Sequence, residues 1–305
     1  MQIFKNAHFP FIKYEALFVG LSFLLFFAAI FVMTTKGFNY GIDFKGGAKL
    51  TYKFSEATHE NQVRKALEGT EFADASVVRY GEPSENRMSI KVALPEEHAK
   101  IGEQITAALD KGFGAGKVTL EQEETVGPRV GKEMRKRAWL TIIFSWLMML
   151  IYIGYRFDFL YGPGAVLSLV HDTTITMGIF ALLGKEVNLT ILAAILTLIG
   201  YSINDTIVVF DRIRENRHRI SHDTIKDVVN ESINSTLSRT VITSLTVFLV
   251  VVVLFFEGGG TLHDFAFTMI IGVIIGTYSS IFVASPCYIW LYRYWPSMRK
   301  LWAKR

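Results

Sequence analysis

Polar side chains that could handle protons stand inside otherwise apolar stretches of this sequence. They are Ser202, Asn204 and Asp205, the adjacent pair His171 and Asp172, and Arg239. A lone carboxylate inside a bilayer helix costs at least about 2.5–3.5 kcal/mol on insertion scales, so it is retained where a function or a partner requires it. Because hydrocarbon supplies no hydrogen-bond partners, these groups should face the interior of a helix bundle and contact one another.

Asp205 and Arg239 form the pair with the clearest chemistry. Desolvation favours the neutral form of a carboxylate, whereas a nearby arginine favours its charged form. A carboxylate held between these two effects can exchange a proton near neutral pH, while arginine stays charged. The two residues lie on consecutive spans joined by one hairpin. We therefore expect Asp205 and Arg239 to handle protons; the alternative is a static ion pair that fixes helix packing.

His171 and Asp172 are neighbours in the chain, so their side chains leave a helix about 100° apart. One interpretation is a polar cluster that packs helices together. The other is a supporting role in a proton path, which we also assign to Ser202 and Asn204.

The elements that must position these residues are membrane helices. Half of the residues are hydrophobic, and the chain contains several long apolar runs, which soluble proteins rarely carry. The net charge of +4 is too small to indicate a nucleic-acid partner. Six transmembrane helices are predicted, the first as an uncleaved span, at 15–35, 138–155, 164–184, 188–210, 240–256 and 265–291.

Small residues recur along two of these spans. Ala193, Thr197, Gly200 and Asn204 form one such face, and Gly272 and Gly276 belong to another. Small residues at this spacing let helices approach closely. Both faces are predicted to contact other helices.

The segment 36–137 has ordinary soluble composition and reads as alternating strands and helices. Strands are expected at 48–54, 75–80, 88–94 and 117–124, and helices at 57–68 and 96–110. The order β-α-β-β-α-β predicts an α+β ferredoxin-like domain between spans 1 and 2.

Lysine and arginine set the expected orientation. They gather in residues 1–14, in the segment 211–238 and in residues 293–305. If the chain crosses the membrane six times, these three segments lie on the same side of the membrane. The positive-inside rule makes that side cytoplasmic, so 36–137 becomes an extracytoplasmic, periplasmic domain.

Two further segments carry charge near the membrane. Lys132, Arg135, Lys136 and Arg137 sit at the outer end of the second span, where we expect them to meet lipid phosphates. The segment 211–238 has apolar residues at helical spacing, which predicts an amphipathic helix lying on the inner membrane surface. The alternative is a docking face for a cytoplasmic partner.

The sequence contains no nucleotide-binding glycine pattern, hydrolase motif or set of metal ligands. Its single cysteine, Cys287, allows no intrachain disulfide. We therefore expect no enzymatic activity and no cofactor, with protons as the coupling ion. Energy would come from an ion gradient or from a partner.

Five motifs resemble those of the SecD/SecF family of bacterial protein-export membrane proteins, within the resistance–nodulation–division superfamily. They are NYGIDFKGG at 39–47, VGPRVGKE at 126–133, RFDFLYGPGAVLSLVHD at 156–172, SINDTIVVFDRIREN at 202–216 and NSTLSRTVITS at 234–244. The resemblance is to the SecF side of the family and extends over nearly the whole chain.

The resemblance implies a subunit that uses the proton-motive force to assist Sec-dependent preprotein translocation across the bacterial inner membrane. It implies a six-span SecD partner, association with the SecYEG translocon and contact with the translocating unfolded preprotein. The family's proton-handling residues map onto Asp205 and Arg239, with a further acidic group supplied by SecD. The alternative is a proton-coupled exporter of small molecules or lipids, although such proteins usually carry two large outer domains in one chain.

Overall fold

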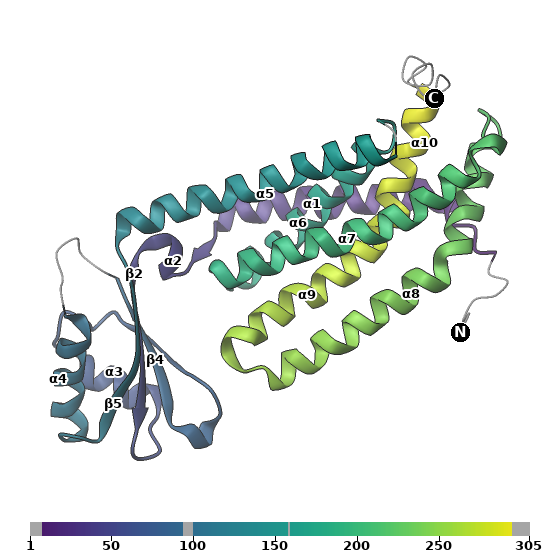
Figure 1. Cartoon of the computed structure of the whole chain (residues 1–305). Coiled ribbons are helices and arrows are strands. Elements are labelled where there is room, and N and C mark those ends of the chain that lie inside the picture. Colours follow the sequence, from purple (N-terminus) through teal and green to yellow (C-terminus); the bar gives the residue numbers. More distant parts are fainter. Residues whose placement is uncertain (1–7, 94–99, 158, 295–305) are drawn as a thin grey trace.

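Six long helices form a bundle that carries an α+β domain at one end (Figure 1). The computed structural model describes residues 8–93, 100–157 and 159–294. Within these residues, six helices are long and apolar enough to cross a membrane, which confirms the predicted number of spans. They run Ile12–Lys36, Pro128–Arg156, Gly162–Leu183, Leu189–Glu215, Ile225–Glu257 and Leu262–Tyr294.

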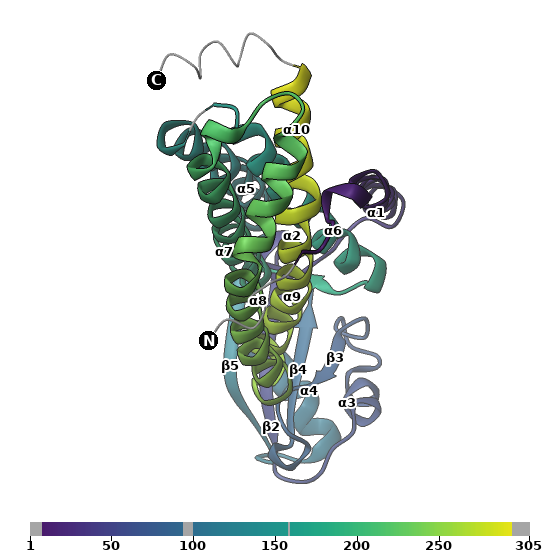
Figure 2. The same ribbon diagram turned by 90° about the vertical axis from the view of Figure 1, so that its right-hand side faces the viewer.

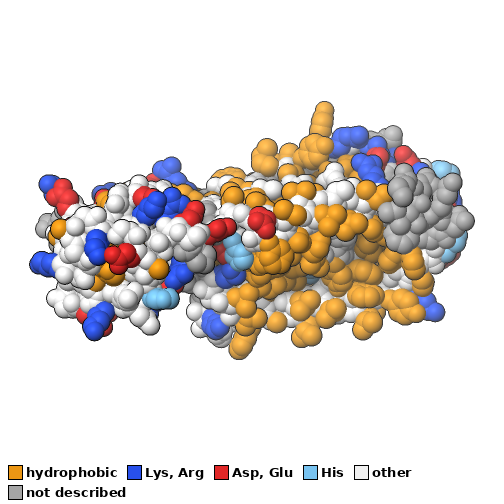
Figure 3. Space-filling model, turned by 90° about the horizontal axis from the view of Figure 1, so that it is seen from below, with side chains coloured by type: hydrophobic (Ala, Val, Ile, Leu, Met, Phe, Trp, Pro, Cys, Tyr) orange, Lys and Arg blue, Asp and Glu red, His pale blue; other side chains and the backbone are white. Residues whose placement is uncertain are grey.

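The first five spans correspond to α1 (Glu15–Lys36), α5 (Pro128–Arg156), α6 (Gly162–Leu183), α7 (Leu189–Glu215) and α8 (Ile225–Glu257). The sixth joins α9 (Gly259–Ser279), a π-helical turn (Ser280–Ala284) and α10 (Ser285–Tyr294). The central helices are α6 and α7. In the most apolar 18-residue stretch of each helix, 61% and 56% of the residues are buried, against 11% in α1 and in α8. Hydrophobic side chains cover much of the face of the bundle seen in Figure 3, as expected of a surface that faces lipid.

The helix α5 starts before the predicted residue 138. Pro128 occupies its first turn, where the missing N–H of proline would have no intrahelical partner anyway. Residues 128–137 therefore belong to this helix and not to the α+β domain. Within them, the Arg135 guanidinium lies 5.0 Å from the centre of the Tyr40 ring.

The segment 211–238 is not a separate surface helix, so that prediction was wrong. Helix α7 continues to Glu215, a short 3-10 turn follows at Arg217–Arg219, and α8 starts at Ile225. The apolar side chains of Val228, Val229 and Ile233 are buried. They pack into the bundle instead of lying against lipid headgroups, so α8 continues directly into the fifth span.

The α+β domain contains β2 (Gly47–Phe54), α3 (Glu60–Leu67), β3 (Ser76–Arg79), β4 (Arg87–Val92), α4 (Ile101–Phe113) and β5 (Val118–Val126). The four strands are antiparallel neighbours in the order β3-β4-β2-β5. The element order is therefore the predicted one, although the predicted start of the second helix at 96 lies outside the described residues. Alternate residues of β2, including Leu50, Tyr52 and Phe54, are buried in the core of the domain.

A compact junction joins this domain to the bundle. The short strand β1 (Asn39–Tyr40) pairs in parallel with β6 (Glu186–Val187), which lies in the turn between α6 and α7. Lys91 of β4 forms an ion pair with Glu186. The N–H of Leu189, at the end of the same turn, donates a hydrogen bond to Asp43 of α2 (Ile42–Lys45) at 2.9 Å. Three segments far apart in the sequence thus meet at one turn: residues 39–45, Lys91 of β4 and the turn itself.

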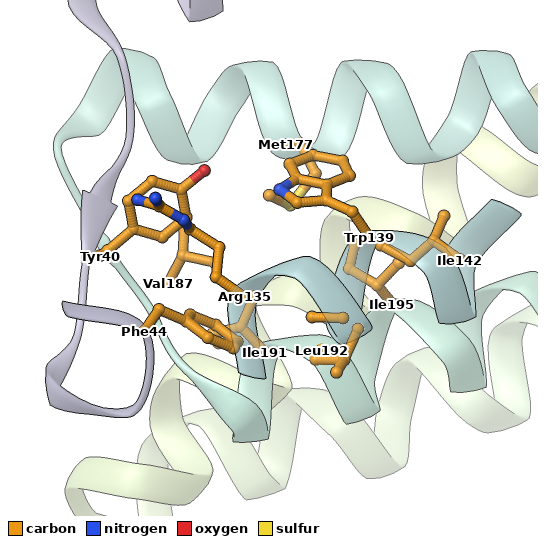
Figure 4. Close-up of a pocket in the computed structure, with 11 residues that line it drawn as sticks. Tyr40, Phe44, Arg135, Trp139, Ile142, Met177, Val187, Ile191, Leu192 and Ile195 are labelled. Carbon is orange, nitrogen blue, oxygen red and sulfur yellow. The ribbon is translucent and has the colours of Figure 1, made fainter. Parts of the chain in front are cut away.

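Two glycines allow the backbones of the junction to touch. Gly46 has φ +82°, and a Cβ placed on it would lie 2.5 Å from the Cα of Pro128. A Cβ on Gly131 would lie 2.7 Å from the Gly46 nitrogen. Beside this contact, Arg135, Tyr40 and Trp139 are among the residues that line a small apolar pocket (Figure 4). The loop that enters the α+β domain is therefore clamped against the first turns of α5.

Gly46→Ala is predicted to destabilise the protein by about 3 kcal/mol or more, because it adds a backbone clash to a conformation that itself costs about 1–3 kcal/mol without glycine. Gly37→Ala is the matched control. Gly37 has φ +71° and an extended ψ, as Gly46 does, but has open space around its Cβ position. Thermal unfolding in detergent measures both. Equal losses in the two variants would show that the clamp contributes nothing.

Tyr52 provides a prediction on alkaline pH. Its hydroxyl donates to the Gly102 carbonyl oxygen at 3.1 Å, and burial raises the pKa of Tyr52 to about 12. The unfolded phenol ionises near pH 10, so the stability that the neutral, buried Tyr52 contributes is fully present below about pH 10 and is lost as the pH rises toward 12. Titration of tyrosinate absorbance should show that Tyr52→Phe removes one phenol from the late part of the curve, whereas Tyr80→Phe leaves that part unchanged. A late part of unchanged amplitude in Tyr52→Phe would contradict this assignment.

Candidate functional site

Asp172 is the centre of a buried polar cluster that joins three helices. Its Oδ2 accepts hydrogen bonds from Ser202 Oγ of α7 at 2.6 Å and from Ser279 Oγ of α9 at 2.8 Å. Its Oδ1 lies 2.9 Å from Nδ1 of His171. The carboxylate, at the middle of α6, is 1% exposed. One side chain therefore fixes the relative positions of α6, α7 and α9.

The Nε2 atom of His171 is also buried, and it has no hydrogen-bond partner among the described residues. The His171 ring stacks on Tyr278 of α9, with ring centres 6.2 Å apart. His171 thus has one nitrogen within hydrogen-bond distance of Asp172 and one that contacts no polar partner among the described residues.

Asp205 forms a second polar contact, one turn along α7 from Ser202. It is 1% exposed, and its Oδ2 accepts from Ser244 Oγ of α8 at 3.3 Å. Ser244 in turn lies 2.7 Å from Thr277 Oγ1 of α9. The Tyr201 hydroxyl adjoins the same two hydroxyl groups. Asp205 is thereby connected through hydroxyls to both α8 and α9.

The hydroxyl partners of Asp205 suit a group that gains and loses a proton. A serine or threonine hydroxyl both donates and accepts hydrogen bonds. The ionised carboxylate accepts from Ser244, and the protonated acid can donate to it while Ser244 donates to Thr277. Thr277 also has an acceptor of its own, the Val273 carbonyl oxygen at 2.8 Å. Either charge state therefore finds partners in the same place.

Arg239 does not form the direct ion pair that the sequence suggested. Its side chain is exposed, and the ion pairs among the described residues do not join it to Asp205. The physical reason is axial position. Asp205 lies level with Ser244, and Arg239 precedes Ser244 by about 7.5 Å of helix. The Arg239 charge still acts on Asp205 at longer range.

Asn204 is exposed as well, on the side of α7 that carries Ala193, Thr197 and Gly200. A Cβ on Gly200 would meet nothing within 4 Å. This predicted small-residue face therefore contacts no other described helix closely. The face on α9 does, because a Cβ on Gly276 would lie 3.1 Å from the Ser202 Cβ.

Sequence reasoning missed Ser244, Thr277 and Ser279, which supply the hydroxyl partners of the two carboxylates. A hydroxyl in an apolar helix is too common to stand out, since it can bond its own backbone. It also missed the π-helical turn at Ser280–Ala284, directly after Ser279. Such turns in helices occur frequently at functional sites.

Comparisons with known proteins cover both the bundle and the junction. The family model described as protein export membrane protein SecD/SecF, C-terminal, matches residues 105–294. The model described as SecD/SecF GG motif matches residues 31–58, which include Gly46 and Gly47. The glycine that is clamped against α5 is thus part of a recognised motif.

Proteins described as protein translocase subunit SecF are similar over nearly the whole chain. The one from Calditerrivibrio nitroreducens is 40% identical over 93% of this chain and 95% of its own length. The one from Magnetococcus marinus is 42% identical over 94% of this chain and 93% of its own length.

Two solved SecDF structures share this fold. The crystal structure of SecDF from Thermus thermophilus, described as a translocon-associated membrane protein, matches with a TM-score of 0.79 and 35% identity. A SecDF in a super-membrane-facing form matches with a TM-score of 0.69 and 36% identity. This chain spans 40% of the length of each of those chains.

Ser279→Ala is predicted to cost about 0.6–1.7 kcal/mol, the range measured for hydrogen bonds between membrane helices. Ser280→Ala is the control. Ser280 is equally buried, but its hydroxyl donates to Thr277 O within its own helix. The free energy of unfolding of the two variants is measured in mixed micelles. Equal losses in Ser280→Ala and Ser279→Ala would show that the hydrogen bond to Asp172 does not contribute to the packing of α9.

Proposed function

Because the chain belongs to the SecD/SecF family of protein export membrane proteins, we propose that it is a SecF-type subunit that assists Sec-dependent translocation of preproteins using the proton-motive force. The family assignment rests on the matched family models and on translocase subunits of about 40% identity. These relatives favour protein translocation over the alternative of a small-molecule or lipid exporter.

The observation that carries proton use is the buried Asp205. A carboxylate that is 1% exposed and contacts hydroxyl groups, in a helix that spans a membrane, is a functional residue by default. Its hydroxyl partners accommodate both of its charge states. Asp172 and His171 of α6 form the supporting cluster. It contacts α7 at Ser202, one turn before Asp205.

We propose that protonation of Asp205 changes how α7 sits against α8 and α9. The ionised form holds Ser244 as a donor and attracts the distant Arg239 charge. Protonation removes that attraction and reverses the hydrogen bond to Ser244. The resulting shift of α7 would move the turn at its start, which carries β6 and contacts β1, Asp43 and Lys91 of the junction. The α+β domain would follow.

The α+β domain is assigned the ferredoxin-like fold and a place outside the membrane. Its antiparallel order β3-β4-β2-β5 supports the first assignment. The basic residues at the opposite end of the bundle support cytoplasmic termini and a bacterial inner-membrane location.

SecD is the proposed partner of the open face of α7. This face presents Asn204, Gly200 and Thr197, and Arg239 is exposed on the neighbouring α8. Small residues permit close approach of a helix, and a charged group beside them calls for a partner of opposite sign. An acidic residue of SecD would fill that role. SecYEG and the unfolded preprotein are the further proposed partners.

Asp205→Asn is predicted to abolish the part of preprotein export that depends on the proton gradient, and Arg239→Met to reduce it strongly. The amide cannot gain a proton, and methionine removes the charge that favours the ionised acid. Export into inverted membrane vesicles, with and without an uncoupler, measures the gradient-dependent fraction.

The matched control is Asp211→Asn, which changes an acid near the end of the same helix that pairs with Arg214 on the surface. It should export normally. Copurification with SecD must be retained in every variant, so that a loss of export is not a loss of assembly. Normal gradient-driven export by Asp205→Asn and Arg239→Met would leave Asp205 a purely structural group.

A further inference from the structure

A lateral groove of about 630 Å³ opens on the side of the bundle between α1 and the last helix. Val19 and Phe23 of α1 form one wall, and Phe282 and Ile289 form the other. Phe23 is 56% exposed, so the groove opens sideways into the region that faces lipid. Figure 2 shows α1 standing to one side of α10 at this end of the bundle. The groove is separate from Asp205 but reaches the edge of the Asp172 cluster, because His171 is among its lining residues.

Charged and aromatic side chains gather at the end of the groove away from the α+β domain. Lys226 and Arg293 supply two positive charges there and Glu15 one negative charge, which leaves a net charge of +1. Glu15 and Lys226 form an ion pair. Trp290, 57% exposed, lines the same end, and tryptophan is typical of the membrane–water interface.

Arg293 is incompletely used by the protein. One terminal nitrogen donates to the His222 carbonyl oxygen at 3.2 Å. Its Nε–H is buried and finds no hydrogen-bond acceptor among the described residues. A buried donor without an acceptor costs free energy, so a ligand that supplies an anionic oxygen would bind here favourably.

We propose that the groove binds one anionic phospholipid of the leaflet farther from the α+β domain. Its phosphate lies beside Arg293 and Lys226, and one acyl chain lies along Phe23, Phe282 and Ile289. The apolar walls match the hydrocarbon chain, and the net positive mouth matches the headgroup. The lipid fills the space between α1 and α10 that the described residues leave empty.

The mouth of the groove argues against an apolar partner helix as the occupant, because Arg293 keeps a buried N–H there without an acceptor among the described residues. A flexible acyl chain follows an irregular groove that a rigid cylinder does not fill.

The test is native mass spectrometry of the full chain released from nanodiscs that contain equal amounts of phosphatidylglycerol and phosphatidylcholine. The wild type should retain one phosphatidylglycerol. Arg293→Gln should reduce that retention about fivefold, the effect of one basic residue at a membrane surface. Val283→Trp, which fills the groove, should abolish retention of both lipids.

Two control variants keep the groove intact. Arg217→Gln removes a charge at the same end of the bundle, and Leu249→Trp adds bulk on the exposed face of α8. Both should retain lipid as the wild type does. A phospholipid with a photoreactive acyl chain, used on the wild type alone, should label peptides of α1 and α10 and so guards against variants that fail to fold.

Four results would overturn the proposal. One is a wild type that retains no phospholipid, and another is undiminished retention by a folded Val283→Trp. The third is retention only after residues 295–305 are removed, which would make the C-terminal segment the natural occupant. Equal retention of the two lipids by wild type and Arg293→Gln would likewise rule out recognition of the anionic headgroup by Arg293.

Discussion

The structure depends on satisfying the carboxylate of Asp172 where no water can do so. Hydrocarbon leaves each buried polar group to be paired within the protein. Ser202, Ser279 and His171 meet that requirement from α7, α9 and α6 itself. Because these bonds need the three helices at one level, they fix the depth at which α7 presents Asp205. The position of the proton-handling candidate is therefore a consequence of how its neighbour is satisfied.

Two of these helices meet the junction, because α6 ends and α7 begins at the turn that carries β6. The turn between α6 and α7 contacts β1, Asp43 and Lys91, so this short segment links the bundle to the α+β domain. Gly46 holds the entry loop against Pro128 without an intervening side chain. A direct contact between two backbones leaves no flexible side chain that could absorb a displacement. In the proposed mechanism, a small movement of α7 would therefore be passed on to the α+β domain.

Periodicity and composition were enough for the coarse fold. Six apolar runs and alternating strand patterns are local signals, and they predicted the spans and the order of the α+β domain. Asp205 and Asp172 were identifiable because a carboxylate in hydrocarbon is costly wherever it lies. The contact of Arg239 was mispredicted because it depends on how far the connection after α7 displaces α8, which no local pattern encodes. The serine partners were missed for the same reason: their importance comes from which helix lies opposite.

The pairing of β1 with β6 has a consequence for biogenesis. Strand β1 is made early, at Asn39–Tyr40, but its partner at Glu186–Val187 follows only after the whole α+β domain and two more spans. Contacts between segments so distant in sequence form late, after the intervening chain has been ordered. The nascent domain must therefore fold while it is tethered by α1 and α5 alone, and the bundle would capture it in a final docking step once α6 and α7 have been inserted.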